Sequence, residues 1–438
     1  MGWSAITGPS RRWRFPSRTD GIVGSRVLFT ESDQAMLDGK AGAASQTAME
    51  LLVAVAESED AQGFLDISAA HIDGGLYHGR AGLDFALSLV DGAGRVVVPT
   101  TLNVSSLDLL HPELYRGDPE TAHAARLLMD AYVDMGCTPS WTCAPYQLAQ
   151  RPGFGDQVAW GESNAIVFAN SVLGARTARY GDFLDICCAL TGRAPAFGLH
   201  TDEGRRGTLR VDLQVPDRLL DDDLLYPVLG HRLGQVAGTD VAVIVGLDQR
   251  AGEDRLKALG AAAASSGAVA MFHVAGVTPE AHTAAAAMAG QAPQRVETID
   301  VDDLIQARAS LSHGEGPLGA VSVGTPHFSV AELAMLADMV KGQTTRVPFY
   351  VNTSRDALSR AEAAGTIAVI EGFGATIVTD TCTYITPILH DVSGVVITNS
   401  AKWAFYAPGN LGVDVVFAGL DECVDSAVSG ELVVGEGW

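Results

Sequence analysis

The sequence has little positive charge and no long apolar run. Its 438 residues contain 29 Lys and Arg against 52 Asp and Glu, which gives a formal net charge of −23. A field of this sign repels nucleic-acid backbones and anionic lipid surfaces. The longest apolar stretches, such as Val241–Leu247, are far shorter than the ~20 residues that a membrane span needs. We therefore expect a soluble protein with no nucleic-acid or membrane partner.

Cysteine is also scarce. Six cysteines in 438 residues are too few for a secreted disulfide scaffold, and no apolar export segment follows the first methionine. None of the six forms a Cys-x-x-Cys pair, so the spacings of zinc ribbons, thioredoxins and ferredoxins are absent. We expect reduced thiols in a cytoplasmic protein. Residues 1–27 carry five arginines against the single acid Asp20 and are interpreted as a basic disordered tail or a leader.

The remainder of the chain has the composition of a folded protein of two or three domains, with 47% hydrophobic and 18% charged residues. Residues 28–235 form an irregular α/β part that carries most of the unusual polar residues. Residues 236–438 repeat a strand, a turn and a helix. Because the expected strands are apolar on both faces, they suit mainly parallel sheets covered by helices, and the fold class is α/β. The expected elements are a helical stretch over 32–58 and strands at 95–98, 241–246, 268–274, 349–352, 376–379, 395–398 and 413–417.

Two segments of the second half resemble each other. Both contain a glycine and then a Thr-Pro pair, Thr278-Pro279 in one and Thr325-Pro326 in the other. Threonine is a good helix N-cap and proline suits the first helical position. The pattern predicts that a helix begins at each pair.

The positions of three cysteines suggest different roles. Cys143 lies in a loop, and Cys382 follows an expected strand, which is where a site assembled from distant segments would place thiolates. Spacing alone leaves open whether these two thiols are metal ligands or inert core residues. Cys423 falls inside an expected helix and is interpreted as core.

Polar runs follow several expected strands. They contain His71, Asn103 and the segment from Thr398 to Lys402. Each run is compatible with turn and capping chemistry, but their recurrence at strand ends favours a ligand site. The Lys402 ammonium is placed to stabilise an alkoxide at Ser400 or to bind a carboxylate; the alternative is a solvated lysine at the start of a helix.

The stretch 160–179 has helical periodicity. A helix that begins near Glu162 would direct backbone N–H groups at an anion. Arg176 and Arg179, near the expected end of this helix, either stabilise the helix terminus or bind substrate, and the sequence leaves both readings open.

Several runs together resemble one family. They are 142–146 (Thr-Cys-Ala-Pro-Tyr), 161–164 (Gly-Glu-Ser-Asn), 170–177, 190–195, 324–327 (Gly-Thr-Pro-His), 380–382 (Asp-Thr-Cys) and 398–402 (Thr-Asn-Ser-Ala-Lys). In this order they resemble the large catalytic portion of aconitase X, over about residues 28–432. The resemblance implies an aconitase-like catalytic body and a hydro-lyase activity.

The resemblance also implies an iron-sulfur cluster. Cys143 and Cys382 are its implied ligands, and Cys188 is our choice for the third, with Cys187 and Cys137 as rivals. The implied catalytic residues are Ser400, Lys402 and His71, with His71 as the proton donor to the leaving hydroxide. The implied substrate-binding residues are Asn103, Glu162, Ser163, Asn164, Arg176 and Asn399.

Single-chain members of the family carry a smaller swivelling domain, which we do not find in this sequence, so a separate small subunit is expected as partner. The implied reaction is dehydration of a small hydroxy acid, with cis-3-hydroxy-L-proline as first choice and mevalonate 5-phosphate as the alternative. An alternative function of a different kind is that of a non-catalytic subunit that retains the fold.

Overall fold

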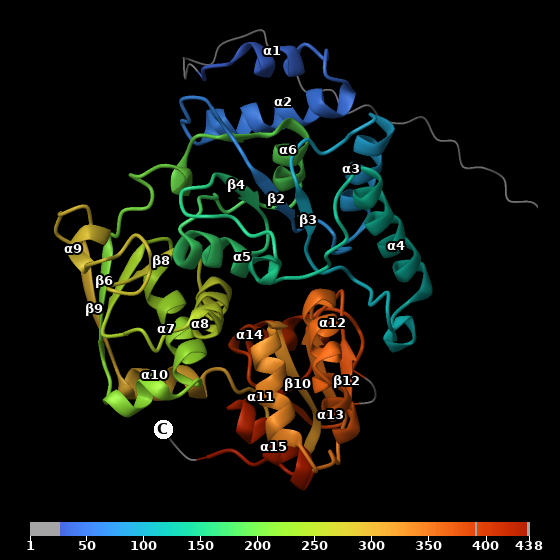
Figure 1. Ribbon diagram of the computed structural model, residues 1–438, viewed down its shortest axis with the longest axis vertical. Helices are drawn as coiled ribbons and strands as arrows, with labels where there is room; N and C mark the ends of the chain where they lie inside the picture. Colours follow the sequence, from blue (N-terminus) through green and yellow to red (C-terminus); the bar gives the residue numbers. More distant parts are fainter. Residues whose placement is uncertain (1–26, 390–391, 436–438) are drawn as a thin grey trace, which may run out of the picture.

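The computed structural model describes residues 27–389 and 392–435, and the expected basic tail lies outside them apart from Val27. Three lobes are visible in Figure 1: a first lobe (residues 27–206, blue to green), a second lobe (207–311, yellow-green) and a third lobe (312–389 and 392–435, orange to red). None of the helices in these described ranges combines the length and hydrophobicity of a membrane-spanning helix.

The first lobe contains a small parallel sheet in the order β3-β2-β4 and an antiparallel pair of β1 and β5. The helical stretch expected over 32–58 is two helices, because Gly39 and Gly42 interrupt it with positive φ angles. The elements are α1 (Glu31–Leu37), α2 (Ala43–Ser58), β1 (Phe64–Asp66), β2 (Ala69–Ile72), α3 (Arg80–Asp91), β3 (Thr100–Leu102), α4 (Pro119–Asp134), β4 (Val158–Trp160), α5 (Ser163–Phe168), a π-helical turn (Ala169–Leu173), α6 (Leu184–Thr191) and β5 (Arg193–Pro195).

The expected strand at 95–98 is wrong. Val96 N donates to the Met135 carbonyl and Val97 N to the Ala189 carbonyl, so the backbone here closes two helix ends instead of pairing with a strand. Val97 is also exposed, and the strand begins later, at Thr100.

The second lobe has a parallel sheet in the order β8-β7-β6-β9. Its elements are β6 (Leu209–Gln214), α7 (Leu225–Ala237), β7 (Ala242–Val245), α8 (Glu253–Ser266), β8 (Phe272–Val274), α9 (Ala284–Ala287), β9 (Arg295–Asp300) and α10 (Val301–Ala309). Because β6 pairs with both β7 and β9, the division that we expected at residues 235 and 236 cuts through this lobe. The boundary lies before β6 instead.

The third lobe has a five-stranded parallel sheet in the order β12-β11-β10-β13-β14. The strands predicted at 349–352, 376–379, 395–398 and 413–417 are all present within one or two residues. The elements are β10 (Leu318–Phe328), α11 (Val330–Val340), β11 (Phe349–Thr353), α12 (Arg355–Ala363), α13 (Thr366–Phe373), β12 (Ala375–Val378), β13 (Val395–Thr398), α14 (Ala401–Leu411), β14 (Val415–Phe417) and α15 (Leu420–Ser429). The predicted α/β class with mainly parallel sheets is confirmed.

Neither Thr-Pro pair begins a helix. The Thr278 hydroxyl bonds the backbone of Val274 and so closes the end of β8, and α9 is capped by Thr283 instead. At the second pair, β10 continues through Pro326 and the helix cap is Ser329, whose hydroxyl accepts from Glu332 N. The helix starts lie a few residues after each pair, because Thr278 closes the end of β8 and Thr325 lies within β10 with its hydroxyl unpartnered.

The apolar core divides into separate clusters, and the cysteines divide with them. Cys137, Cys187 and Cys188 belong to the core of the first lobe. Cys423 lies in α15 in a third-lobe cluster and is fully buried, which confirms its assignment as core. Cys143 and Cys382 belong to the cluster that joins the second and third lobes. The last two thiols therefore lie where lobes meet.

Candidate active site at the lobe junction

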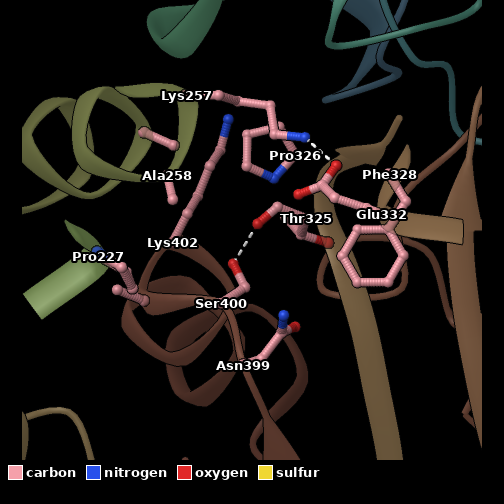
Figure 2. A pocket seen from close by; sticks show the side chains of 12 residues that line it. Pro227, Lys257, Ala258, Thr325, Pro326, Phe328, Glu332, Asn399, Ser400 and Lys402 are labelled. Atoms are coloured by element: carbon pink, nitrogen blue, oxygen red, sulfur yellow. Dashed lines mark hydrogen bonds and ion pairs between the residues drawn. The ribbon is translucent and has the colours of Figure 1, made fainter. Parts of the chain in front are cut away.

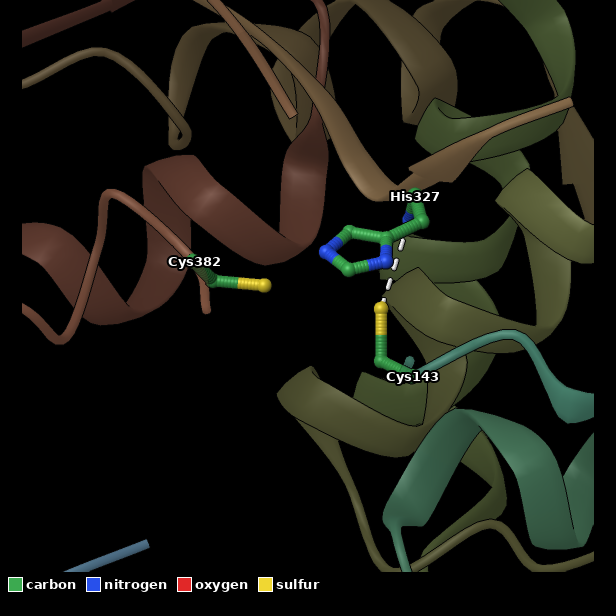
Figure 3. Close-up of side chains that lie close together, drawn as sticks. All are labelled: Cys143, His327 and Cys382. Carbon is green, nitrogen blue, oxygen red and sulfur yellow. Dashed lines mark hydrogen bonds between the residues drawn. The ribbon is translucent and has the colours of Figure 1, made fainter. Parts of the chain in front are cut away.

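A buried group of two thiols and one imidazole occupies the junction. Cys143 comes from a first-lobe loop, His327 from the end of β10 and Cys382 from the loop after β12 (Figure 3). One potential ligand atom of each residue lies within 4.8 Å of the other two. The His327 backbone N–H also donates to Cys143 Sγ over 3.3 Å. The arrangement brings together the two cysteines that the sequence predicted, from positions 239 residues apart in the chain.

The His327 ring has a defined tautomer. Its Nε2 lies 3.0 Å from the Thr381 carbonyl oxygen, which only accepts hydrogen bonds, so Nε2 carries the proton. Nδ1 then keeps a lone pair, which faces the Thr142 hydroxyl at 3.2 Å. This ring therefore offers one nitrogen donor next to the thiols. His327 was visible in the sequence within the run 324–327, but nothing in the spacing marked it as a ligand.

The pKa values of the two junction thiols are shifted in opposite directions. Burial alone would raise the pKa of Cys143, but a hydrogen bond from Cys382 and electrostatic interactions with His327 and Lys402 lower it to about 6. The pKa of Cys382 is raised well above its ordinary value, because it holds the shared proton and is buried. A thiolate is therefore available at neutral pH, and a thiolate is the form that binds metals.

A buried ion pair crosses the junction beside the thiols. Lys402, in the first turn of α14, pairs with Glu162, which caps α5. The side chains are only 3% and 5% exposed. Burial lowers the pKa of Lys402, but the Glu162 carboxylate raises it well above its ordinary value, so the lysine is charged. The alternative of a solvated lysine is wrong.

Glu162 is held firmly in place. Its backbone has φ +66°, an uncommon conformation for a residue other than glycine, and its carboxylate accepts from Ala165 N at 2.7 Å. Asn164 Nδ2 donates both to this carboxylate, at 2.8 Å, and to the Cys143 carbonyl, at 2.6 Å. Ser163 Oγ lies 3.3 Å from Glu162 Oε1. Three consecutive residues that we predicted to bind substrate thus form one hydrogen-bonded group. Asn164 connects this group to Cys143 through the Cys143 carbonyl.

A small cavity of about 40 Å³ lies next to Lys402 (Figure 2). Asn399 and Ser400 line it, as predicted, together with Thr325 and Lys257. Asn399 Oδ1 and Thr325 Oγ1 are buried without a hydrogen-bond partner, so the cavity presents polar atoms that a ligand can satisfy.

Ser400 is engaged in local structure. Its hydroxyl accepts from Trp403 N at 3.0 Å, which makes it the N-cap of α14, and it donates to the Thr325 carbonyl oxygen. The hydroxyl lines the cavity but its proton is already committed. Its predicted role in proton transfer gains no support from these contacts.

His71 lies at the carboxyl end of β2 with its ring buried. Nδ1 contacts the Thr101 hydroxyl at 2.8 Å, whereas Nε2 has no partner. Burial lowers the pKa of His71 to about 4, so the ring is neutral at pH 7. This pKa does not favour the predicted role of His71 as the proton donor to the leaving hydroxide, which stays a prediction.

Two carboxyl groups that were not among the predicted site residues lie beside this strand end. Asp73 is half-buried and accepts from Asn103 Nδ2, while its backbone N–H donates to Asp185 Oδ2 at 2.6 Å. Burial and the Glu162 charge raise the pKa of Asp73 to about 7, and burial raises that of Asp185 to about 8. The signal for Asp73 was its position two residues after His71. Nothing in the sequence marked Asp185.

Two predicted site residues lie elsewhere. Cys188 is within α6, buried next to Cys187, and its side chain interacts with the Tyr180 hydroxyl rather than with Cys143 or Cys382. Arg176 lies beyond the end of its helix and binds the His200 carbonyl at 3.3 Å and the exposed Asp202 carboxylate at 2.5 Å. Its guanidinium is thus held at the surface of the first lobe.

Three α/β lobes that enclose thiols, an imidazole, a buried ion pair and unsatisfied polar atoms define a multidomain protein with an interdomain site for a small molecule. Family models identify the lobes. The aconitase X first domain matches residues 26–203, the second domain 207–309 and the third domain 318–429. These boundaries agree with the three lobes in Figure 1.

Individual relatives agree with the family models. The chain is 46% identical over 409 residues to a cis-3-hydroxy-L-proline dehydratase of Pseudomonas aeruginosa, which covers 92% of this chain and 70% of that protein. It is 37% identical over 397 residues to a phosphomevalonate dehydratase large subunit of Methanothermobacter thermautotrophicus, covering 90% and 96%. A crystal structure of Thermococcus kodakaraensis aconitase X in its holo-form superimposes with a TM-score of 0.83 at 32% identity, over 92% of this chain and 100% of that one. The chain belongs to the aconitase X family.

Proposed function

We propose that this chain is the catalytic part of a dehydratase that converts cis-3-hydroxy-L-proline to 1-pyrroline-2-carboxylate. The observation that carries the dehydratase proposal is the junction itself, where the Cys143, His327 and Cys382 group lies beside the buried Glu162–Lys402 pair. The choice of substrate is supported by the dehydratase of Pseudomonas aeruginosa, at 46% identity over 92% of this chain.

The residues at the junction fit an iron-sulfur cluster. Cys143 and Cys382 are the thiolate ligands of the proposal, and the His327 ring is the third protein donor, because one ligand atom of each residue lies within 4.8 Å of the others and all three residues are buried. When bound, such a group supplies an electrophile that makes a hydroxyl a better leaving group. We do not propose Cys188 as the third cluster ligand, because it lies in the first-lobe core.

The chain's own residues have definable tasks. Loss of water removes the Cα proton and the 3-hydroxyl of the substrate, and the resulting enamine tautomerises to the imine. The Lys402 ammonium binds the substrate carboxylate and so stabilises the negative charge that develops next to it. Asn399 Oδ1, which has no partner, accepts a hydrogen bond from the substrate amine.

Asp73 is the proposed proton carrier, in place of His71. With a pKa of about 7 its carboxyl group holds or releases a proton near neutral pH, which suits general acid and base work. Asn103 Nδ2 donates to it and fixes its orientation. The charges of Glu162 and Lys402 both act on its pKa, so Asp73 lies within electrostatic reach of the buried ion pair.

Phosphomevalonate is the second candidate substrate, because a phosphomevalonate dehydratase large subunit is 37% identical to this chain and matches it over 96% of its own length. A phosphate needs additional free cations. The other buried lysine at the cavity, Lys257, is already neutralised by Glu332 and by Asp254 at 3.1 Å. Lys402 is also paired, with Glu162, so the preference for the amino-acid substrate rests on the dehydratase at 46% identity.

A small partner subunit is part of the proposal, because the archaeal relatives are named large subunits. A cytoplasmic location also stays a prediction. The test is an anaerobic assay of the chain, alone and with a co-expressed small subunit, against cis-3-hydroxy-L-proline, its trans isomer and mevalonate 5-phosphate. We expect imine formation from the cis isomer only. Turnover of mevalonate 5-phosphate alone would favour the second candidate.

A further inference from the structure

The loop that carries Cys382 has a constrained backbone. Asp380, two residues before the thiol, has φ +59°, a left-handed conformation that costs free energy in any residue with a side chain. The residue is fully buried. Such a conformation persists only when the surroundings impose it, and contacts from two lobes hold Asp380 in place.

Arg355 binds the Asp380 carboxylate from the same lobe. It is the first residue of α12, and its Nε and Nη2 each donate to one carboxylate oxygen, both at 2.6 Å. This two-pronged geometry fixes both distance and orientation, which a single ammonium cannot do.

The first lobe holds the same segment from the other side. Ser105 N donates to the Asp380 carbonyl at 2.7 Å, and Leu109 N donates to the Asp380 carboxylate at 3.0 Å. In return, the buried Asp108 carboxylate accepts from Thr379 N at 2.8 Å and from the Thr379 hydroxyl at 3.0 Å. Each lobe therefore contributes one carboxylate that binds the backbone of the other.

We infer that Arg355 and Asp380 are positioning residues that hold the Cys382 thiol against Cys143, and that this interlobe clamp sets metal affinity at the junction. The inference rests on the proposed function, because it takes Cys143 and Cys382 as ligands. Cys143 comes from the first lobe and Cys382 from the third, so their separation depends on contacts that join these lobes. The clamp is the set of such contacts closest in sequence to Cys382.

The test uses Co²⁺, because thiolate coordination to this ion gives charge-transfer absorption without any catalytic turnover. The full chain is freed of metal, titrated anaerobically with Co²⁺ alone and compared with Arg355→Gln, Arg355→Lys and Asp380→Asn. Asparagine tolerates a left-handed backbone, so the last variant removes the charge without adding strain. Arg360→Gln is the matched control, because Arg360 lies on the same helix, is exposed and pairs only weakly with Asp356 at 3.4 Å.

We expect Co²⁺ affinity to fall at least about tenfold in Arg355→Gln and Asp380→Asn, with partial recovery in Arg355→Lys and no change in Arg360→Gln. The thermal unfolding midpoint serves as the second readout, and Asp380→Asn decides the matter if Arg355→Gln does not fold. Wild-type affinity in both folded variants would overturn the clamp alone. A wild-type chain without charge-transfer absorption would overturn the metal centre itself and the clamp with it.

Discussion

Two sets of buried thiols in this molecule have the same residue type and opposite chemistry. Cys143 and Cys382 lie at the lobe junction, where the pKa of Cys143 is lowered to about 6 despite its burial. Cys187 and Cys188 lie in α6, in the first-lobe core, where burial and the nearby Asp185 carboxyl raise their pKa values. Burial is similar in the two places, so burial does not account for the difference.

The neighbours account for it. The junction supplies a partner thiol, an imidazole and the Lys402 ammonium, all of which stabilise a thiolate. The first-lobe core offers apolar side chains and an acid. The side chains around a cysteine therefore decide whether it is a candidate ligand. At the junction these side chains come from different lobes.

The largest expected effect comes from replacing one sulfur atom by oxygen, which should have different results in the junction thiols and in the first-lobe thiols. Cys382→Ser should abolish dehydration while the protein stays folded, because a core of this size does not depend on a metal. Cys188→Ser should instead lower the free energy of unfolding by about 1–3 kcal/mol, since it buries a hydroxyl, and leave turnover within a few-fold. Turnover assays and urea unfolding of both variants provide the check. The comparison fails if Cys188→Ser is the inactive protein.

The second prediction removes a charge from the junction. Lys402→Met should lower kcat/KM by roughly 30-fold to 1000-fold, as expected for the loss of about 2–4 kcal/mol of charge stabilisation in a site screened from water. It should also lower the free energy of unfolding by about 3–5 kcal/mol, because Glu162 is left buried and unpaired.

A second substitution separates these two effects of Lys402. Glu162→Gln combined with Lys402→Met should recover part of the stability but none of the activity. Wild-type kinetics in Lys402→Met with an intact metal centre would show that the pair is only structural.

The third prediction concerns pH and the acid next to the first-lobe thiols. The pKa of Asp185 is raised from 3.8 to about 8, so its ionisation opposes folding. Its favourable contribution is complete below about pH 4 and is lost as the pH rises to about 8, and stability should fall over this range. Asp185→Asn should flatten this part of the profile. Urea unfolding at pH 5.5 and 8.5 measures it, and parallel profiles of the two proteins would count against the assignment.

The smallest effect is expected at Cys423, which is buried in a third-lobe cluster far in sequence from both thiol sets. Cys423→Ser should cost about 1–2 kcal/mol of unfolding free energy and leave kcat/KM unchanged. Loss of metal in this variant, measured by its absorption spectrum, would mean that burial alone makes a thiol essential here.

The sequence predicted the elements whose signals are local. The third-lobe strands, such as Val395–Thr398, are apolar runs that end in polar residues, and this pattern needs no knowledge of the partner strand. The segment 95–98 has the same apolar pattern but no strand next to it, so its backbone bonds two helix ends instead. Whether a segment has a neighbouring strand depends on the whole fold and cannot be predicted from that segment alone.

The site could be predicted only in part for the same reason. Cys143, Cys382, Glu162 and Lys402 were identified one by one, but the pairing of Glu162 with Lys402 joins residues 240 positions apart. Cys188 was chosen because it precedes a family-like run, and a sequence does not tell which lobe a helix faces. Asp185 was missed because its altered pKa arises from burial, which only the packed structure supplies.

The most direct test of the account is anaerobic reconstitution with iron and sulfide, followed by metal and sulfide analysis and an absorption spectrum of the wild type, Cys382→Ser and Cys188→Ser. We predict a coloured wild-type protein with bound iron and sulfide, a colourless Cys382→Ser variant and a Cys188→Ser variant that retains both colour and iron. A colourless, iron-free wild-type protein, or loss of iron in Cys188→Ser but not in Cys382→Ser, would contradict the assignment of the junction as the cluster site.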